Sequence, residues 1–142
     1  MRNEDRMRIA VIDGQGGGIG KHIVERLRKR FPELYILALG TNALATGAMM
    51  RAGATEGASG ESAICYNANQ VDMIVGSFAI MMVYELLGEI TPAMAAAISA
   101  SKAVKLLLPI QRGGIQLVGI PRSPLPHQIE ALVNEVEERM KA

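Results

Sequence analysis

The sequence predicts an α/β domain with a doubly wound, mostly parallel β-sheet, and three observations lead to this fold class. Short apolar runs alternate with segments of helical periodicity, a glycine-rich turn follows the first run, and 142 residues suit one domain. Right-handed crossovers between parallel strands leave few topologies. We expect the strand order 3-2-1-4-5-6 in a domain spanning residues 8–142, after a flexible arm of residues 1–7.

The first half of the chain shows this alternation clearly. "RIAVID" is a continuous apolar run, typical of a parallel strand covered on both faces. The next segment carries an apolar stripe at helical spacing and stops before Pro32. Thr41 or Asn42 is placed to cap the second helix. The expected elements are strand 8–13, helix 18–30, strand 34–40, helix 43–53, a weak strand 54–58 and a short helix 60–70.

The second half adds three strands and three helices. An apolar run predicts a strand at 72–77 and a buried helix at 78–87, and Thr91-Pro92 is a helix start. Strands at 104–110 and 115–120 are separated by only "QRGG", which is too short for a parallel crossover, so we expect an antiparallel hairpin. A last helix is expected at 126–141. The whole pattern is that of a Rossmann-like domain.

Composition restricts the function classes. Hydrophobic residues make up 49% of the chain, and a net charge of +1 gives no case for binding nucleic acid or an anionic membrane. The longest apolar run has 15 residues, fewer than the roughly 20 that span a bilayer. No signal peptide is predicted, and one cysteine, Cys65, fits a reducing compartment. We therefore expect a cytoplasmic protein.

Five glycines lie between Gly14 and Gly20, in the turn that joins the first strand to the first helix. Such a turn lies at the carboxyl edge of the sheet, where strand order reverses and ligands bind. Free N–H groups and the helix dipole favour an anion there, although a tight packing turn is the alternative. We expect a nucleotide or phosphate site lined by Asp13, Gly14, Gln15, Gly16, Gly17, Gly18, Ile19, Gly20, Lys21, Thr41, Asn42, Gly76 and Ser77.

The glycine spacing excludes two common phosphate-binding motifs. Ile19 replaces the third glycine of G-x-G-x-x-G, and Gln15 and His22 break the P-loop pattern. Gly14-x-x-x-Gly18-Ile19-Gly20 instead resembles the T-G-x-x-x-G-I-G loop of short-chain dehydrogenases/reductases. That resemblance implies that these three glycines bind NAD(P) or another nucleotide.

In several positions this chain departs from the pattern of short-chain dehydrogenases/reductases, so the resemblance does not extend to their oxidoreductase chemistry. Asp13 stands where the family has threonine, and no acid follows the second strand to hold ribose hydroxyls. The catalytic Y-x-x-x-K is absent, because Tyr35, Tyr66 and Tyr84 are followed four residues later by Leu39, Gln70 and Gly88. The catalytic residues, if the protein is an enzyme, therefore stay unassigned.

The chain as a whole resembles a small bacterial family known only as a domain of unknown function. The stretches that carry the similarity are "IAVIDGQGGGIGK", "DMIVGS", "LGEITPAMA" and "SKAVKLLLPI". The resemblance implies a Rossmann-like fold and no established activity.

Two alternatives to simple nucleotide binding stay open. In a magnesium-dependent phosphoryl-handling enzyme, Lys21 would contact phosphate, Asp13 would hold the ion and His22 would lie nearby. In an interaction module, low-charge helices would contact further copies, so we expect a homo-oligomer. The side chains that suggest this contact are Met49, Met50, Met81, Met82 and Met94. Ser77 is expected to touch the ligand or to cap a helix, Arg112 and Arg122 to be solvated, and no metal site is predicted.

Overall fold

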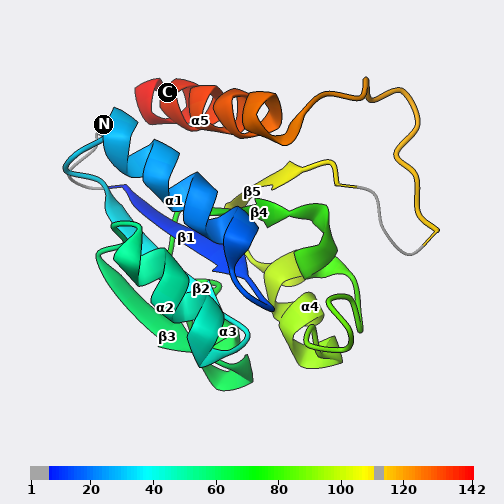
Figure 1. Cartoon of the computed structure of the whole chain (residues 1–142). Coiled ribbons are helices and arrows are strands. Elements are labelled where there is room, and N and C mark those ends of the chain that lie inside the picture. Colours follow the sequence, from blue (N-terminus) through cyan, green and yellow to red (C-terminus); the bar gives the residue numbers. More distant parts are fainter. Residues whose placement is uncertain (1–6, 111–113) are drawn as a thin grey trace.

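The computed structural model describes residues 7–110 and 114–142 and shows an α/β domain with one parallel sheet (Figure 1). Its strands are β1 (Arg8–Asp13), β2 (Tyr35–Gly40), β3 (Glu56–Ser59), β4 (Met73–Ser77) and β5 (Val104–Leu108). Its helices are α1 (Gly18–Arg30), α2 (Ala43–Arg51), α3 (Glu61–Asn67), the 3-10 helix η1 (Phe78–Met81), α4 (Pro92–Ala100) and α5 (Leu125–Lys141).

The strand order is β3-β2-β1-β4-β5, and every pair is parallel. The first strand therefore lies in the middle, paired with β2 on one side and with β4 on the other. Asp13 at the end of β1 is in register with Gly40 at the end of β2. The predicted reversal of strand order between β1 and β4 is confirmed, and the glycine-rich turn begins there.

Two apolar layers explain why the strands are apolar throughout. Alternate residues of β1 point to opposite faces, so Ile9 and Val11 pack in one core while Ala10 and Ile12 pack in the other. The first core lies under α1, α2 and α5, and the second lies under α3, η1 and α4. With both faces covered, the central strands have no solvent-facing side to carry polar residues.

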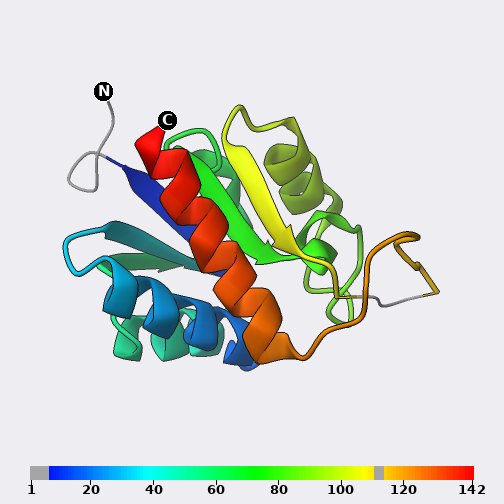
Figure 2. The same cartoon turned by 90° about the horizontal axis from the view of Figure 1, so that it is seen from above.

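The last helix, α5, runs across the sheet between α1 and β5 (Figure 2). Its apolar stripe of Ile129, Leu132, Val133 and Val136 is buried. Ion pairs join its outer face to α1: Arg26 contacts Glu130 at 2.6 Å, and Arg30 contacts Glu130 at 3.1 Å and Glu137 at 2.8 Å. The sequence-based helix at 126–141 is thus confirmed to within one residue at its start.

The expected sixth strand at 115–120 is not seen, and the sheet ends at β5. These residues are coil and turn, and Gly119 has a left-handed φ of 85° that interrupts extended backbone. Ile115, Val118 and Ile120 are exposed, so the apolar pattern that suggested a strand does not reflect burial. The turn of the expected hairpin includes residues 111–113, which lie outside the described part.

The expected helix at 78–87 is also wrong beyond its first turn. After η1 the chain turns through three non-glycine residues with left-handed backbone, Tyr84 (φ 68°), Leu86 (φ 59°) and Leu87 (φ 56°), which a right-handed helix excludes. Leu86 and Ile90 are nonetheless buried, so their apolar side chains do mark a buried segment, although the segment is not a regular helix.

At the N-terminus, Met7 is buried in the core, which shortens the expected arm of residues 1–7; the remainder of that arm lies outside the described residues.

Candidate functional site

The carboxylate of Asp13 accepts hydrogen bonds from the glycine loop that follows it. Asp13 ends β1 and is only 8% exposed. Its Oδ1 accepts a hydrogen bond from the Gly14 N–H at 2.8 Å, and its Oδ2 accepts one from the Gly20 N–H at 2.7 Å. Gly20 is the third residue of α1, so the negative charge also lies at the positive end of that helix. Both oxygens of Asp13 therefore serve to hold the loop against the helix.

Three of the glycines are needed for close packing. Gly17 has a left-handed φ of 73°, and a Cβ there would lie 2.9 Å from the Cα of Ala45 in α2. A Cβ at Gly20 would lie 2.6 Å from the Met49 sulfur, and one at Gly14 would lie 2.6 Å from Thr41 Oγ1. Glycine at these positions lets the loop approach α2 and the end of β2. This part of the loop fits the packing alternative.

Gly16 and Gly18 have no such packing role. A Cβ at either position would meet nothing within 4 Å, and both residues are exposed. Within the described chain, the hydrogen bonds of the loop leave the N–H groups of Gly16, Gly18 and Ile19 without an acceptor. Two of these donors are the first residues of α1, where the helix dipole adds positive potential. The loop thus presents an open face of N–H donors suited to an anion.

A second carboxylate, Glu89, reaches this site from the segment between η1 and α4. Its Oε1 accepts hydrogen bonds from the Gln15 N–H at 2.7 Å, Thr41 Oγ1 at 2.5 Å and Asn42 Nδ2 at 3.1 Å. Burial alone raises the pKa of Glu89, but these three hydrogen bonds together outweigh it and hold the pKa below its ordinary value of 4.5. Glu89 is therefore ionised at neutral pH and joins the loop after β1 to the loop after β2.

The loops that follow β1 and β2 lie together, as predicted. The Thr41 N–H donates to the Asp13 carbonyl at 3.0 Å, and Asn42 Nδ2 donates to the Gln15 carbonyl at 3.1 Å. Asn42 Oδ1 also accepts from the Ala45 N–H at 2.8 Å and so caps α2.

The predicted residues at the end of β4, Ser77 and Gly76, have structural roles. Ser77 is buried, and its Oγ accepts from the Ala79 N–H at 3.2 Å, which makes it the cap of η1. Gly76 allows β4 to approach β1, because a Cβ there would lie 2.7 Å from the Ile12 carbonyl oxygen. Both residues are explained by packing and capping. Lys21 is exposed on α1 beside the loop.

A cavity of about 550 Å³ opens beside the first turn of α1. Ile19 lines one side, Pro109 and Ile110 line it from the end of β5, and Arg122 contributes a positive charge. Its volume lies within the roughly 300–1,000 Å³ of small-molecule sites. Arg122 is exposed and forms no ion pair with the described residues, so its charge is available to a ligand in this cavity.

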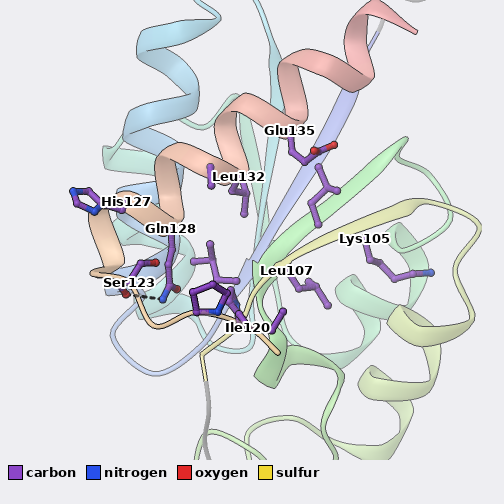
Figure 3. A pocket seen from close by; sticks show the side chains of 13 residues that line it. Lys105, Leu107, Ile120, Ser123, His127, Gln128, Leu132 and Glu135 are labelled. Atoms are coloured by element: carbon purple, nitrogen blue, oxygen red, sulfur yellow. Dashed lines mark hydrogen bonds between the residues drawn. The ribbon is translucent and has the colours of Figure 1, made fainter. Parts of the chain in front are cut away.

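Another cavity, of about 590 Å³, lies between β5 and α5 (Figure 3). Leu107, Ile120 and Leu132 give it a mostly apolar lining, and Gln128 extends into it from α5. Gln128 Nε2 donates to the Ser123 carbonyl at 2.9 Å, while its buried Oε1 has no hydrogen-bond partner in the described part of the chain. This cavity shares Pro109, Ile120 and Gln128 with the cavity beside Ile19, and its lining also includes the charged residues Lys105 and Glu135.

Residues 8–141, nearly the whole chain, match the family model of a domain of unknown function, DUF3842. The protein belongs to the DUF3842 family. A search of curated proteins and a search of solved structures found no match. The expectation of an uncharacterised family with a Rossmann-like fold is thus confirmed by the family match and the parallel sheet.

Other sequence-based candidates in this DUF3842 chain have structural roles. His22 Nδ1 lies 3.2 Å from Glu25 Oε1 on the exposed face of α1. Met49 and Met94 are buried in the two cores, so they cannot form part of an exposed contact surface. The described residues contain no group of His, Cys, Asp and Glu arranged to hold a metal, and no helix among them is long and apolar enough to cross a membrane.

Sequence reasoning did not identify Glu89. It lies 74 residues after Gln15, in a segment where no regular element places it. One signal in the sequence could have indicated it: Glu89 is an acid within a largely apolar stretch. A carboxylate that lies close to an apolar core requires hydrogen-bond donors, so such an acid is expected to have specific partners.

Proposed function

We propose that this DUF3842 protein binds a nucleotide at the carboxyl edge of the sheet. The observation that carries the proposal is the open face of the glycine loop, where Gly16 and Gly18 leave space and the N–H groups of Gly16, Gly18 and Ile19 have no acceptor within the described chain. Backbone donors at a helix start suit a phosphate group, and the missing side chains allow it to approach.

The surroundings of the loop support a ligand larger than a phosphate ion. The loop lies where strand order reverses, which is the usual ligand position in this architecture. The cavity beside Ile19 has room for a further group, and Arg122 in its lining compensates phosphate charge. The negative charge of Asp13 repels a phosphate only weakly, because both carboxylate oxygens already accept hydrogen bonds from backbone N–H groups. The same bonds disfavour the alternative role of Asp13 as a magnesium ligand.

Calorimetric titration with NAD, NADP and ATP at millimolar concentration tests this proposal. We expect saturable binding of at least one nucleotide, and its loss in Gly18→Val, because the branched side chain fills the space above the loop without meeting a neighbour. Gly47→Val is the matched control: this glycine lies in α2, where the nearest atom to an added Cβ is the end of the Arg51 side chain at 3.4 Å. The proposal is wrong if no nucleotide binds, or if both variants bind like the original protein.

We also propose that the outer edge of β5 contacts a second copy of the chain. β5 is the last strand of the sheet, and the exposed apolar residues Ile115, Val118 and Ile120 follow it closely in the chain. An unpaired sheet edge and exposed apolar residues are each common contacts between subunits. Light scattering is expected to give a mass above 15.2 kDa that falls in Val118→Lys. A monomer at high concentration contradicts this proposal and leaves nucleotide binding unaffected.

A further inference from the structure

The structure places a carboxylate beside the end of β2, although the sequence has no acid there. In nucleotide-binding sheets of this topology, an acid at the end of the second strand binds ribose hydroxyls. In this chain β2 ends at Gly40, followed by Thr41 and Asn42. Glu89 fills the gap from another part of the chain, because its Oε1 contacts both of those side chains, at 2.5 and 3.1 Å.

The hydrogen bonds of Glu89 are confined to one of its two oxygens. Oε1 accepts from Gln15, Thr41 and Asn42, which fully uses its acceptor capacity. Oε2 has no hydrogen bond to the described residues, and the side chain is only half-buried. An ionised carboxylate fixed through one oxygen retains the other as an acceptor. A ligand hydroxyl that reaches this oxygen gains a charge-assisted hydrogen bond.

The backbone around Glu89 fixes its position. Leu86 and Ile90, on either side of it in the sequence, are buried in the core under α4. The Tyr84 N–H donates to the Ile90 carbonyl at 2.7 Å, and the Ile90 N–H donates to the Glu85 carbonyl at 3.1 Å. These bonds close the turn that contains the left-handed residues. The carboxylate is thus held in place before any ligand arrives, which reduces the entropy cost of binding.

We propose that Glu89 binds the vicinal hydroxyls of the ribose of the nucleotide, and so selects ribonucleotides with a free 2′-hydroxyl. This inference rests on the proposed nucleotide binding. The phosphate occupies the open face at Gly16 and Gly18, and the ribose lies toward Gln15 and Thr41. A 2′-phosphate brings negative charge against the Glu89 carboxylate, and a 2′-deoxyribose lacks the hydroxyl that donates to it. Both ligands therefore bind more weakly than the ribonucleotide.

Calorimetry with three probes tests this role: AMP, 2′-deoxy-AMP and adenosine 2′,5′-bisphosphate. The original protein is expected to bind AMP about tenfold more tightly than either of the others, the effect of one hydrogen bond to a charged group. Glu89→Gln keeps an oxygen that accepts from Gln15 and Thr41 but removes the charge. The affinity ratios of AMP to 2′-deoxy-AMP and of AMP to adenosine 2′,5′-bisphosphate are therefore both expected to fall toward one. Glu85→Gln is the control, because it removes one charge from the same segment, and the side-chain hydrogen bonds of the described loop residues do not include Glu85.

The affinity ratios separate a role in selectivity from a structural one. If Glu89 only supports the loop, Glu89→Gln lowers the affinity for all three probes equally and leaves the ratios between these affinities unchanged. That result overturns this inference but not nucleotide binding. If neither protein binds any of the three probes, this inference fails, and the titration with NAD, NADP and ATP decides separately whether the proposed nucleotide binding fails with it. Thermal denaturation of Glu89→Gln shows whether the variant is folded; should it be unfolded, the original protein's preference among the three probes still decides, and equal affinities overturn the inference.

Discussion

Asp13 Oδ2 accepts a hydrogen bond of 2.7 Å from the N–H of Gly20, seven residues later in the chain. This contact joins the end of β1 to the first turn of α1 and encloses the glycine loop between them. It accounts for an acid directly before a loop whose N–H donors suit an anion. The charge is offset by two backbone donors and the helix dipole, so Asp13 shapes the loop and leaves the N–H donors of its outer face open.

Replacement of Asp13 by asparagine is expected to destabilise the fold. The amide retains one acceptor oxygen, but its NH₂ group faces an N–H donor, and the buried N–H then has no partner. A hydrogen bond to a charged group contributes about 1.5–3 kcal/mol, so we expect the free energy of unfolding to fall by about 2 kcal/mol. Urea denaturation measures this change. Glu138→Gln, at an exposed position of α5, is the control, and equal stability of the two variants contradicts the role given to Asp13.

Neighbouring glycines of the loop are expected to respond differently to alanine. At Gly17 the left-handed backbone and the contact with Ala45 at 2.9 Å both oppose a Cβ, so Gly17→Ala is expected to cost about 2 kcal/mol or more. At Gly16 nothing lies within 4 Å, so Gly16→Ala is expected to change stability by less than about 0.5 kcal/mol. Thermal melting of the two variants compares them directly. Similar losses at both positions contradict the division of the loop into a packed and an open part.

Acid conditions are expected to weaken the contact of Glu89 with the loops. The hydrogen bonds that Glu89 accepts hold its pKa in the folded protein below the ordinary 4.5, so near that pH the unfolded chain binds more protons than the folded one. The contribution of Glu89 to stability is therefore complete above the unfolded pKa and is lost as pH falls through the lower, folded pKa.

Urea midpoints from about pH 7 down to about pH 3.5 measure this dependence. The difference in unfolding free energy between the original protein and Glu89→Gln is expected to stay constant above the ordinary pKa and to shrink below it. A difference that grows on acidification contradicts the direction of the pKa shift. Glu85→Gln, which lies outside the hydrogen-bond network of Glu89, is expected to show no such trend.

The sequence was sufficient for those features that depend on local patterns. The apolar runs that became β1, β2 and β4 are buried on both faces, and such strands are recognisable because they have no polar side. Thr91 before Pro92 marked the start of α4, since the cap and the proline act within one turn. For residues 78–87 and 115–120 the same apolar pattern was compatible with several backbone conformations: the expected helix does not continue beyond its first turn, and the expected strand does not form.

The sequence by itself determined the family, the parallel sheet and the position of the glycine loop at its carboxyl edge, because these follow from periodicity, glycine spacing and chirality. Only the tertiary structure decided what surrounds the loop. In the folded chain the two carboxylate oxygens of Asp13 accept hydrogen bonds from the N–H groups of Gly14 and Gly20. Glu89 accepts one from the Gln15 N–H, although 74 residues separate the two in the sequence. Contacts of this kind depend on how the turn before α4 folds against the core, and no local propensity encodes that arrangement.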